Sequence, residues 1–420
     1  RNPKHYFPVN AKTACAVAPA APARWYICGV DQVLVDAEVQ VSEGFLKELN
    51  LVAGESIVAP EGEFAEITSR IEAAKLPWRF APGGTVANSL NNYTWLSGES
   101  AVLLGAISRD ITFGDAASQF LAQSPPGLDL SFLKGVVGRV GIALTLISPS
   151  GERSFVVAPG VSNALDDEDI PEALVQRSCA LVTSLYTLGN SEWPIARATI
   201  RALELANAAG IPTALGLGTA GLVSHYRERV IELLQSSVNV AAMNEREAEA
   251  LTGLTDRFAA AEQILEWVDM VILTQGPDGM LVGGYTDHSI RRETGEPLGN
   301  TSIGHFNQWE YSRLVRRKDA PDPLKCYSHV HPYKGGPDRL VNTNGAGDAA
   351  LAAILHDLAA NRYHQSQVPG SAKHAGEIPT LSYSSLSRIA QYGNRVAYEV
   401  LRGHSPRLNG PVADDEGGID

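Results

Sequence analysis

Hydrophobic residues in this chain of 420 residues form short continuous runs, and longer amphipathic stretches separate them. The stretches at 194–210 and 246–253 carry apolar residues at helical spacing. Continuous apolar runs are typical of strands buried on both faces, because a strand with one solvent face alternates instead. The pattern predicts an α/β fold with a mostly parallel sheet between helices, and ligands at the carboxyl ends of the strands. The predicted strands are 25–30, 100–108, 180–185, 211–218, 238–244 and 270–276.

Two regions depart from this alternation. Residues 137–160 contain two strand-like runs around a turn with Pro149 and Gly151, which predicts a hairpin. Polar and apolar residues alternate at 36–41, and together these features predict a small accessory β-sheet. Residues 284–340 are polar and rich in Gly, Pro and basic side chains, so we predict a long insertion there.

Charge and composition exclude several classes of protein. The chain has 34 Lys and Arg against 47 Asp and Glu, a formal net charge of -13, so nothing overall attracts a nucleic-acid backbone. No apolar run approaches the roughly 18 residues of a membrane-spanning helix. The four cysteines are scattered without a C-x-x-C pair, which argues against a structural zinc site and fits a reducing, cytoplasmic compartment. Residues 1–24 are predicted to form a loose N-terminal arm.

The sharpest chemical signal is a four-residue motif directly before an Ala- and Leu-rich stretch at 349–360, which predicts a helix. The first N–H groups of a helix have no partner inside it, and small residues let an anion approach them. A carboxylate beside an anion is costly unless it has a function, such as taking a proton from an attacking hydroxyl. The alternative is a glycine turn with an acidic helix start. The motif is Gly345, Ala346, Gly347 and Asp348.

Two further motifs bring polar groups to predicted strand ends or helix starts. Gly83 and Gly84 precede a helix-like run, where the backbone can approach a small ligand, and Asn88 can both donate and accept. Asp31 and Asp36 follow the first strand, where a carboxylate can accept hydrogen bonds from the two adjacent hydroxyls of a sugar. An ordinary turn and a solvated carboxylate are the alternatives.

Asn244 and Glu247 follow the run at 238–244 and share one face of a helical first turn. An amide and a carboxylate in this arrangement can hold a hydrated Mg²⁺ and phosphate oxygens. The alternative is a helix N-cap followed by acidic first-turn residues, which needs no ligand.

A competing motif lies at Gly216–Gly221, where G-x-G-x-x-G follows a strand-like run. The spacing is roughly that of a dinucleotide-binding fingerprint, which leaves open a dinucleotide-dependent oxidoreductase. The sequence G-x-x-x-x-G-K-[ST] does not occur in the chain, so a P-loop is excluded.

The order of these motifs resembles the ribokinase-like (PfkB) family of carbohydrate and nucleoside kinases. An Asp after the first strand, then G-G-x-x-x-N, N-x-x-E and T-x-G-A-G-D before a helix follow one another as in that family. The resemblance covers about 25–405 and implies a three-layer kinase domain with a mostly parallel sheet flanked by helices. It also implies a small β-sheet lid from about 37–82 and 137–160, the insertion at 284–340 and a C-terminal tail at 406–420.

The same resemblance implies roles on the acceptor side of the site. An anion hole would bind the moving phosphoryl group, and a carboxylate base would take the acceptor's proton. The anion hole would be Gly345, Ala346 and Gly347, and the catalytic base Asp348. The residues that would hold or close on the sugar are Asp36, Asp31, Gly83, Gly84 and Asn88.

The resemblance further implies ATP and Mg²⁺ as cofactors. Asn244 and Glu247 would organise Mg²⁺ and phosphate, with Glu247 acting on the metal through water. Thr274 and Gly276 would line the nucleotide site. Asn394 would lie near the adenine.

Stretches at 4–10, 242–253, 327–337 and 404–408 are similar to the branch of the family that acts on inosine and guanosine. This likeness implies transfer of the ATP γ-phosphoryl group to the 5′-hydroxyl of either small-molecule nucleoside, giving IMP or GMP. An adenosine or sugar kinase, a silent nucleotide-binding regulator and the oxidoreductase remain alternatives. A homodimer is left open, and neither nucleic acid nor membrane is expected as a partner.

One position departs from the family pattern. Asn342 stands where the family usually has Asp, which removes a charge and puts a monovalent-cation site in doubt. The residues that read the purine are not set by the sequence, because many side chains can pair with its O6 and N1–H. Asn91, Asn92 and Tyr93 are candidates.

Overall fold

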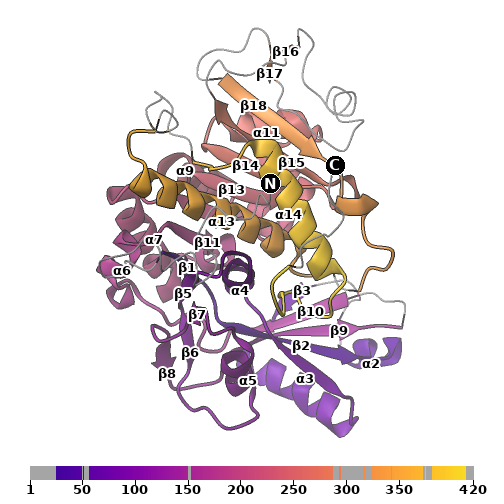
Figure 1. Cartoon of the computed structure of the whole chain (residues 1–420). Coiled ribbons are helices and arrows are strands. Elements are labelled where there is room, and N and C mark those ends of the chain that lie inside the picture. The colour runs from indigo at the N-terminus through magenta and orange to yellow at the C-terminus, as the bar shows by residue number, and fades with distance from the viewer. Residues whose placement is uncertain are drawn as a thin grey trace.

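A nine-stranded sheet forms the centre of the protein in the computed structural model (Figure 1). Seven neighbouring strands of this sheet run parallel, and the last two strands at one edge continue it antiparallel. In spatial order the strands are β7 (Leu128–Asp129), β5 (Ser100–Leu104), β1 (Tyr26–Val30), β11 (Ala180–Ser184), β12 (Thr213–Gly216), β13 (Val240–Asn244), β14 (Met270–Thr274), β15 (Met280–Thr286) and β18 (Leu324–Val330). The structure describes residues 25–49, 51, 56–149, 153–286, 293–294, 316–317, 324–341, 343–371, 374 and 381–412.

All six predicted strands are confirmed, and the run at 100–108 divides into two. Its second half, β6 (Ala106–Ser108), leaves the large sheet and pairs with β8 (Lys134–Val136). Near the end of the predicted insertion at 284–340 lies β18, which pairs along its whole length with β15. Within the same stretch, β16 (Glu293–Thr294) pairs with β17 (Arg316–Arg317).

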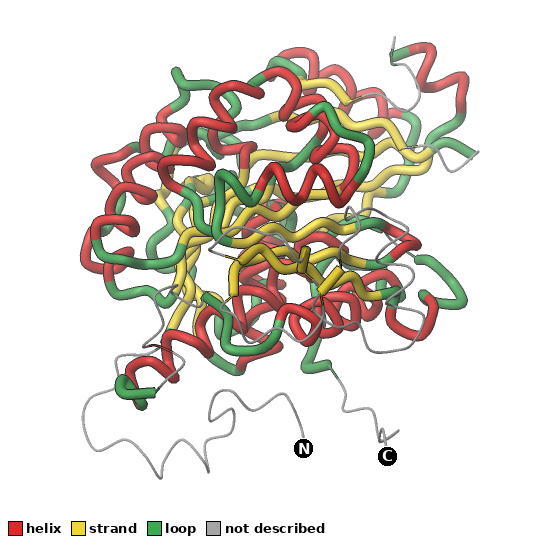
Figure 2. Tube along the Cα trace, turned by 90° about the horizontal axis from the view of Figure 1, so that it is seen from above, coloured by secondary structure: helices red, strands yellow, loops and turns green. Residues whose placement is uncertain are grey.

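Helices cover both faces of the large sheet, as Figure 2 shows, so the predicted three-layer fold is confirmed. Alternate side chains of one strand enter different cores: Cys28 of β1 packs on one face and Ile27 on the other. The first face carries α6 (Glu172–Gln176), α7 (Pro194–Ala208), α8 (Ala220–His225), α9 (Arg227–Ser237), α10 (Glu245–Thr252) and α11 (Arg257–Ile264). The second carries α4 (Thr85–Ser97), α5 (Ala116–Gln123), α13 (Ala346–Gln367) and α14 (Leu386–Leu401).

A second, five-stranded sheet lies at the bottom of Figure 1. The predicted hairpin at 137–160 is confirmed, since its two strands pair antiparallel. Phe64, Ile67 and Leu144 belong to a separate core beneath α2 (Glu43–Glu48) and α3 (Glu61–Ala73). The strand order is β3 (Ser56–Val58), β10 (Arg153–Ala158), β9 (Gly141–Ile147), β2 (Leu34–Gln40) and β4 (Trp78–Pro82).

Short 3₁₀ helices lie in several of the connections between these elements. They are η1 (Asp167–Asp169), η2 (Leu185–Leu188), η3 (Gly276–Asp278) and η4 (Tyr333–Gly335). Among the described helices, none combines the length and the apolar character that crossing a bilayer requires. The predicted N-terminal arm at 1–24, most of 284–323, Asn342 and residues 413–420 lie outside the described residues.

Candidate active site

The N-terminus of α13 has no side-chain cap among the described residues. Gly345 has φ of 78°, in the left-handed region, and the helix begins at Ala346. Glycine is needed here twice over, because a Cβ would also lie 2.5 Å from the Cβ of Pro406. Among the described residues no side chain caps this helix, so its first N–H groups remain available for an anion. The predicted helix start is confirmed, and Asp348 lies in its first turn.

The end of β1 and the start of α4 lie unusually close together. A Cβ on Gly29 of β1 would lie 2.6 Å from a methyl carbon of Val86, so only glycine lets α4 pack this tightly on the strand. This contact brings the start of α4 to Asp31, whose carboxylate accepts a 2.9 Å hydrogen bond from the backbone N–H of Ala87. Asp31 is therefore fully buried against a helix N-terminus.

The paired glycines before α4 make room for two carboxylates. A Cβ on Gly83 would lie 2.4 Å from Oδ1 of Asp36, and a Cβ on Gly84 would lie 2.6 Å from Oδ2 of Asp31. Gly84 also has φ of 89°. The structure thus brings the two predicted aspartates and the two predicted glycines to one place, where β2 and β4 of the small sheet meet α4.

Asn88 connects this group to α13. Its Nδ2 donates a 3.0 Å hydrogen bond to Oδ2 of Asp348, across 260 positions of the sequence. Asn88 is 5% exposed, so its side chain is buried within the protein. Asp348 is left with a second carboxylate oxygen for another partner.

Arg407, which the sequence did not indicate, joins these candidate residues. Its Nε donates to Oδ1 of Asn88 at 2.8 Å, and its Nη2 donates to the carbonyl oxygen of Gly83 at 2.8 Å. The residue is 4% exposed, although it lies in the predicted tail at 406–420. A single arginine beyond the last helix forms no local pattern, and its partners are more than 300 positions away.

Burial shapes the charges of this group. It raises the pKa of Asp348 to about 7 and that of Asp31 to about 7, against a partial lowering by the hydrogen bonds from Asn88 and Ala87. Burial also raises the pKa of Asp36 to about 6, which the nearby Arg407 partly opposes. The pKa of Arg407 falls to about 10 for the same reason, with all three carboxylates acting to raise it. The site is a compact cluster of one cation among three acids.

The N-terminus of α10 is closed, in contrast to that of α13. Asn244 accepts from the backbone N–H groups of Arg246 and Glu247, and the carboxylate of Glu247 accepts from the N–H and side-chain amide of Asn244. This reciprocal capping box is the alternative that the sequence left open. Glu247 is 4% exposed, and burial raises its pKa to about 7.

Thr274 and Gly276 lie beside this helix start. Thr274 is the register partner of Asn244 across β13 and β14, and Gly276 begins η3 two residues later with φ of 52°. The structure therefore brings these two residues and the capping box to the carboxyl ends of adjacent strands. Within the described residues no group of three or more metal-ligating side chains occurs.

Asn394 of α14 has both amide hydrogens engaged. Its Nδ2 donates to the carbonyl oxygens of Val330 and His331 at 2.9 and 2.8 Å, which ties α14 to the end of β18. Asn91 and Asn92 are engaged similarly: Asn91 donates to the carbonyl oxygen of Leu408, and Asn92 accepts from its N–H. Tyr93 is fully buried beside them, and a purine-reading role for the three residues stays a prediction.

The glycine motif at 216–221 follows β12 as predicted and opens the short helix α8. Gly218 has φ of 80°, and a Cβ there would lie 2.9 Å from the ring of Tyr186. Thr219 caps α8 by accepting from the N–H of Leu222. The motif thus makes a close ring contact and a capped turn.

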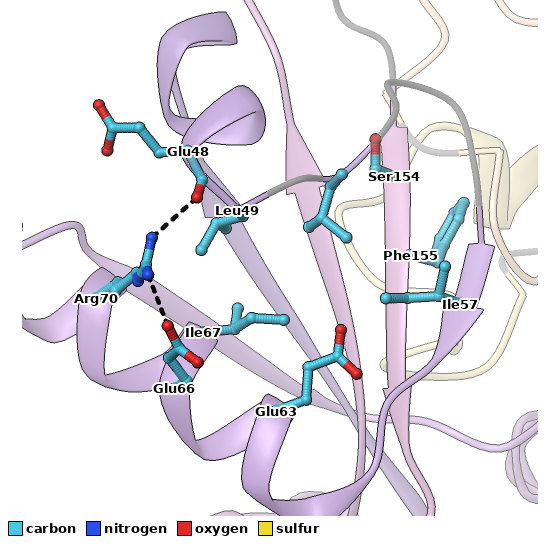
Figure 3. Close-up of a pocket in the computed structure, with 10 residues that line it drawn as sticks. Glu48, Leu49, Ile57, Glu63, Glu66, Ile67, Arg70, Ser154 and Phe155 are labelled. Atoms are coloured by element: carbon cyan, nitrogen blue, oxygen red, sulfur yellow. Dashed lines mark hydrogen bonds and ion pairs between the residues drawn. The ribbon is translucent and has the colours of Figure 1, made fainter.

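A pocket of about 340 Å³ lies on the small sheet, away from these residues (Figure 3). It is lined by Leu49, Ile67 and Phe155, and Arg70 at its edge donates to Glu66 and to the carbonyl oxygen of Glu48. None of the predicted site residues lines it. Most of the predicted site residues lie instead at strand ends and helix starts around the large sheet.

Comparison with known proteins identifies the group to which this chain belongs. The model of the pfkB family of carbohydrate kinases matches residues 48–294. The chain is a member of the pfkB family. Guanosine-inosine kinase of Escherichia coli is 40% identical over 425 residues, covering 100% of this chain and 97% of that protein. A probable chloroplastic fructokinase-6 of Arabidopsis thaliana is 24% identical over 71% of this chain and 67% of its own length.

Solved structures confirm the ribokinase-like fold of this pfkB chain. Adenosine kinase of Sinorhizobium meliloti matches with a TM-score of 0.66 at 20% identity, over 92% of this chain and 97% of that chain. Adenosine kinase of Schistosoma mansoni in complex with adenosine and AMP matches with a TM-score of 0.61 at 17% identity, over 93% and 99%. Membership of a kinase family removes the reason to assign the glycines at 216–221 to an oxidoreductase.

Proposed function

We propose that this chain is an ATP-dependent nucleoside kinase that transfers the γ-phosphoryl group to the 5′-hydroxyl of inosine or guanosine, giving IMP or GMP. The full-length likeness to a guanosine-inosine kinase supports the substrate class. The observation that carries the chemistry is the position of Asp348, a carboxylate in the first turn of a helix whose N-terminus is open. The proposed base and the proposed anion site thereby lie within the same first turn of the helix.

On the acceptor side, Asp348 accepts the proton of the attacking hydroxyl while the N–H groups of Ala346 and Gly347 stabilise charge on the transferred phosphoryl group. Asp36 accepts hydrogen bonds from the ribose hydroxyls. Positioning and electrostatics of this kind supply most of the catalysis in phosphoryl transfer.

The residues fit Mg²⁺ only as a hydrated ion. Both carboxylate oxygens of Glu247 accept hydrogen bonds from Asn244, and Glu247 would hold Mg²⁺ through water. When bound, Mg²⁺ neutralises phosphate charge. Thr274 and Gly276 line the nucleotide side in this proposal. We assign Asn394 a place beside the adenine, with its amide oxygen, for which the described residues supply no donor, as the group that acts.

The reactants are small molecules of the cell interior, and we propose cytoplasmic purine salvage as the setting. The small sheet carries Asp36 and lies beside the start of α4, which supports a role as a lid over the sugar. Closure of such a lid excludes water that would otherwise hydrolyse ATP.

A panel of acceptors tests the proposal. Purified protein with ATP and Mg²⁺ is given inosine, guanosine, adenosine, ribose or fructose, and ADP release and the phosphorylated product are measured. Inosine and guanosine are expected to give the highest kcat/KM, with IMP and GMP as products. Preferred phosphorylation of adenosine or of a free sugar would contradict the substrate assignment while leaving the kinase chemistry intact.

A further inference from the structure

The segment that follows α14 passes between the starts of α4 and α13. Pro406 packs against Gly345, where a Cβ would come within 2.6 Å of the Pro406 carbonyl oxygen. Leu408 is fixed from the other side, since its N–H donates to Oδ1 of Asn92 at 2.7 Å. The backbone on both sides of Arg407 is therefore held against the two helices that carry the anion site and the sugar-side glycines.

The side chain of Arg407 uses this position to orient Asn88. An arginine only donates, so its Nε must face the oxygen of the Asn88 amide, and the amide nitrogen then faces Asp348. A second nitrogen of the same planar fork binds the carbonyl oxygen of Gly83, which fixes the rotation of the guanidinium. The result is a chain of bonds from Gly83 through Arg407 and Asn88 to Asp348.

Charge and packing hold the guanidinium at this point. The carboxylates of Asp31 after β1, Asp36 on β2 and Asp348 on α13 favour the charged form of the guanidinium. The centre of the Phe120 ring of α5 lies 5.3 Å from its central carbon. Glu247 on α10 adds a further negative charge near Asp348. Among the described residues, Nη1 of Arg407 is buried without a partner, so two of its three nitrogens carry the contacts.

We propose that Arg407 is a positioning residue for phosphoryl transfer, which acts by fixing Asn88 so that Asn88 holds the carboxylate of Asp348 toward the acceptor hydroxyl. The inference rests on the proposed function in taking Asp348 as the base. It adds a residue from beyond the last helix to the working parts of the site. Since misplacement of a reacting group by about 1 Å costs on the order of 10²-fold in rate, the bond chain is expected to affect kcat more than KM.

A double-mutant cycle tests whether the two residues act as one unit. The variants Arg407→Ala, Asn88→Ala and the double variant are compared for kcat with the acceptor that the wild-type protein phosphorylates best. Each single change is expected to lower kcat by about 10²-fold, and the double change is expected to be no worse than the more severe single change. If the two single losses of kcat multiply in the double variant, the proposal is overturned, because Arg407 would then act on the substrate independently of Asn88, for example through Nη1.

Two further variants separate positioning from stability. Arg407→Lys keeps a cation among the three acids, but one ammonium cannot reproduce the fork to both Asn88 and Gly83, so kcat is expected to stay low. Wild-type turnover by this variant would overturn the proposal. Guanidinium ion added to Arg407→Ala is expected to restore part of kcat, and failure to restore any would also count against it. Arg402→Ala, at an exposed arginine just after α14, is the control and should leave kcat unchanged.

The choice of acceptor keeps the two claims apart. If the acceptor panel favours a sugar over inosine and guanosine, the proposed function fails, but the cycle is still measured on that sugar. If the nucleosides are phosphorylated and the cycle is additive, the proposed function stands and the positioning role of Arg407 fails. Thermal unfolding of every variant is measured alongside, so a loss of fold is distinguished from a loss of turnover.

Discussion

Two helix starts at the same edge of the large sheet differ in what binds the backbone N–H groups of their first turns. At α10, Asn244 and Glu247 bind each other's backbone and side chains, and the first N–H groups are used inside the protein. At α13, Gly345 offers no side chain, and its left-handed conformation leaves the first N–H groups of the helix exposed to a ligand. Both sequences combine a small or polar residue with an acid three positions later, so the difference lies in the residue at the cap.

The comparison shows that one helix start is closed by its own side chains and that the other has no side-chain cap among the described residues. A capping box typically contributes about 0.5–2 kcal/mol to stability and closes the terminus to anions. An open terminus gives up that contribution and gains a site with free donors and the positive end of the helix dipole. One carboxylate oxygen of Asp348, beside the open terminus, accepts from Asn88, whereas both carboxylate oxygens of Glu247 accept from its own cap residue, Asn244.

The largest effect is expected from Asp348→Asn. This change removes the proton acceptor while keeping a side chain of the same shape beside Asn88, so kcat should fall by about 10²- to 10⁴-fold. Nucleoside binding, measured by calorimetry, should be little changed. A kcat close to that of the wild type would exclude Asp348 as the base.

A smaller effect is expected at the sugar side. Asp36→Ala removes an acceptor for the ribose hydroxyls, and hydrogen bonds to a charged group contribute about 1.5–3 kcal/mol, so the nucleoside KM should rise about 10- to 100-fold. Glu38→Ala, one pleat further along β2, is the matched control. A change confined to the KM for ATP would show that the ribose assignment is wrong.

The pH dependence follows from the raised pKa of Asp348. Turnover needs the ionised carboxylate, so kcat should fall about tenfold for each pH unit below the pKa of about 7. Stability should change in the opposite sense. The folded chain holds this proton more tightly than the unfolded chain, so the stabilisation is present below about pH 4 and is lost as the pH rises through about 7.

Melting temperatures of the ligand-free protein at about pH 5 and about pH 8 test this direction of the stability change. Asp31, Asp36 and Glu247 add to the same change, because their pKa values are also raised. The melting temperature at the lower pH should be higher, and Asp348→Asn should reduce the difference. An unchanged difference in that variant would mean that Asp348 titrates normally in the folded protein.

Two glycines of one motif should respond differently. Gly345→Ala imposes a left-handed conformation on a residue with a Cβ, at about 1–2 kcal/mol, and also meets Pro406, so the melting temperature and kcat should both fall. Gly347→Ala meets no described atom within 4 Å and should keep the melting temperature. Its methyl group would stand where the phosphoryl group approaches, so kcat should fall alone. Equal kcat for Gly347→Ala and wild type would place the anion elsewhere.

The smallest effect is expected at the closed helix start. Asn244→Ala removes the cap of α10 and should lower the free energy of unfolding by about 1 kcal/mol. Asp256→Ala removes a comparable cap from α11, where Asp256 accepts from two backbone N–H groups, and should cost a similar amount. Only Asn244→Ala should raise the Mg²⁺ concentration needed for turnover. Equal Mg²⁺ dependence in the two variants would leave α10 with a structural role alone.

The strands of the parallel sheet could be predicted because burial on both faces leaves continuous apolar runs. The two antiparallel strands at the sheet edge could not, since β15 contains Gly283 and Gly284 and β18 contains Lys325 and Ser328 among its apolar positions. Strands of this composition look like part of a polar insertion until their partners are known.

The candidate site also has one part that could be predicted from the sequence and one part that could not. The open start of α13 was predictable because small residues directly before a strong helix former constrain the local backbone. Arg407 was not, because its meaning depends on Asn88 and Gly83, which are brought to it only by the fold. Asn91 and Asn92 also bind the backbone of Leu408, a contact between distant parts of the sequence that no local pattern indicates.

The most direct test is a crystal structure of the protein with ADP, Mg²⁺, inosine and aluminium fluoride as a mimic of the phosphoryl group in transfer. The mimic is expected within hydrogen-bond distance of the N–H groups of Ala346 and Gly347, with the nucleoside 5′-oxygen at the carboxylate of Asp348. A mimic bound elsewhere, with nothing at the start of α13, would contradict the account.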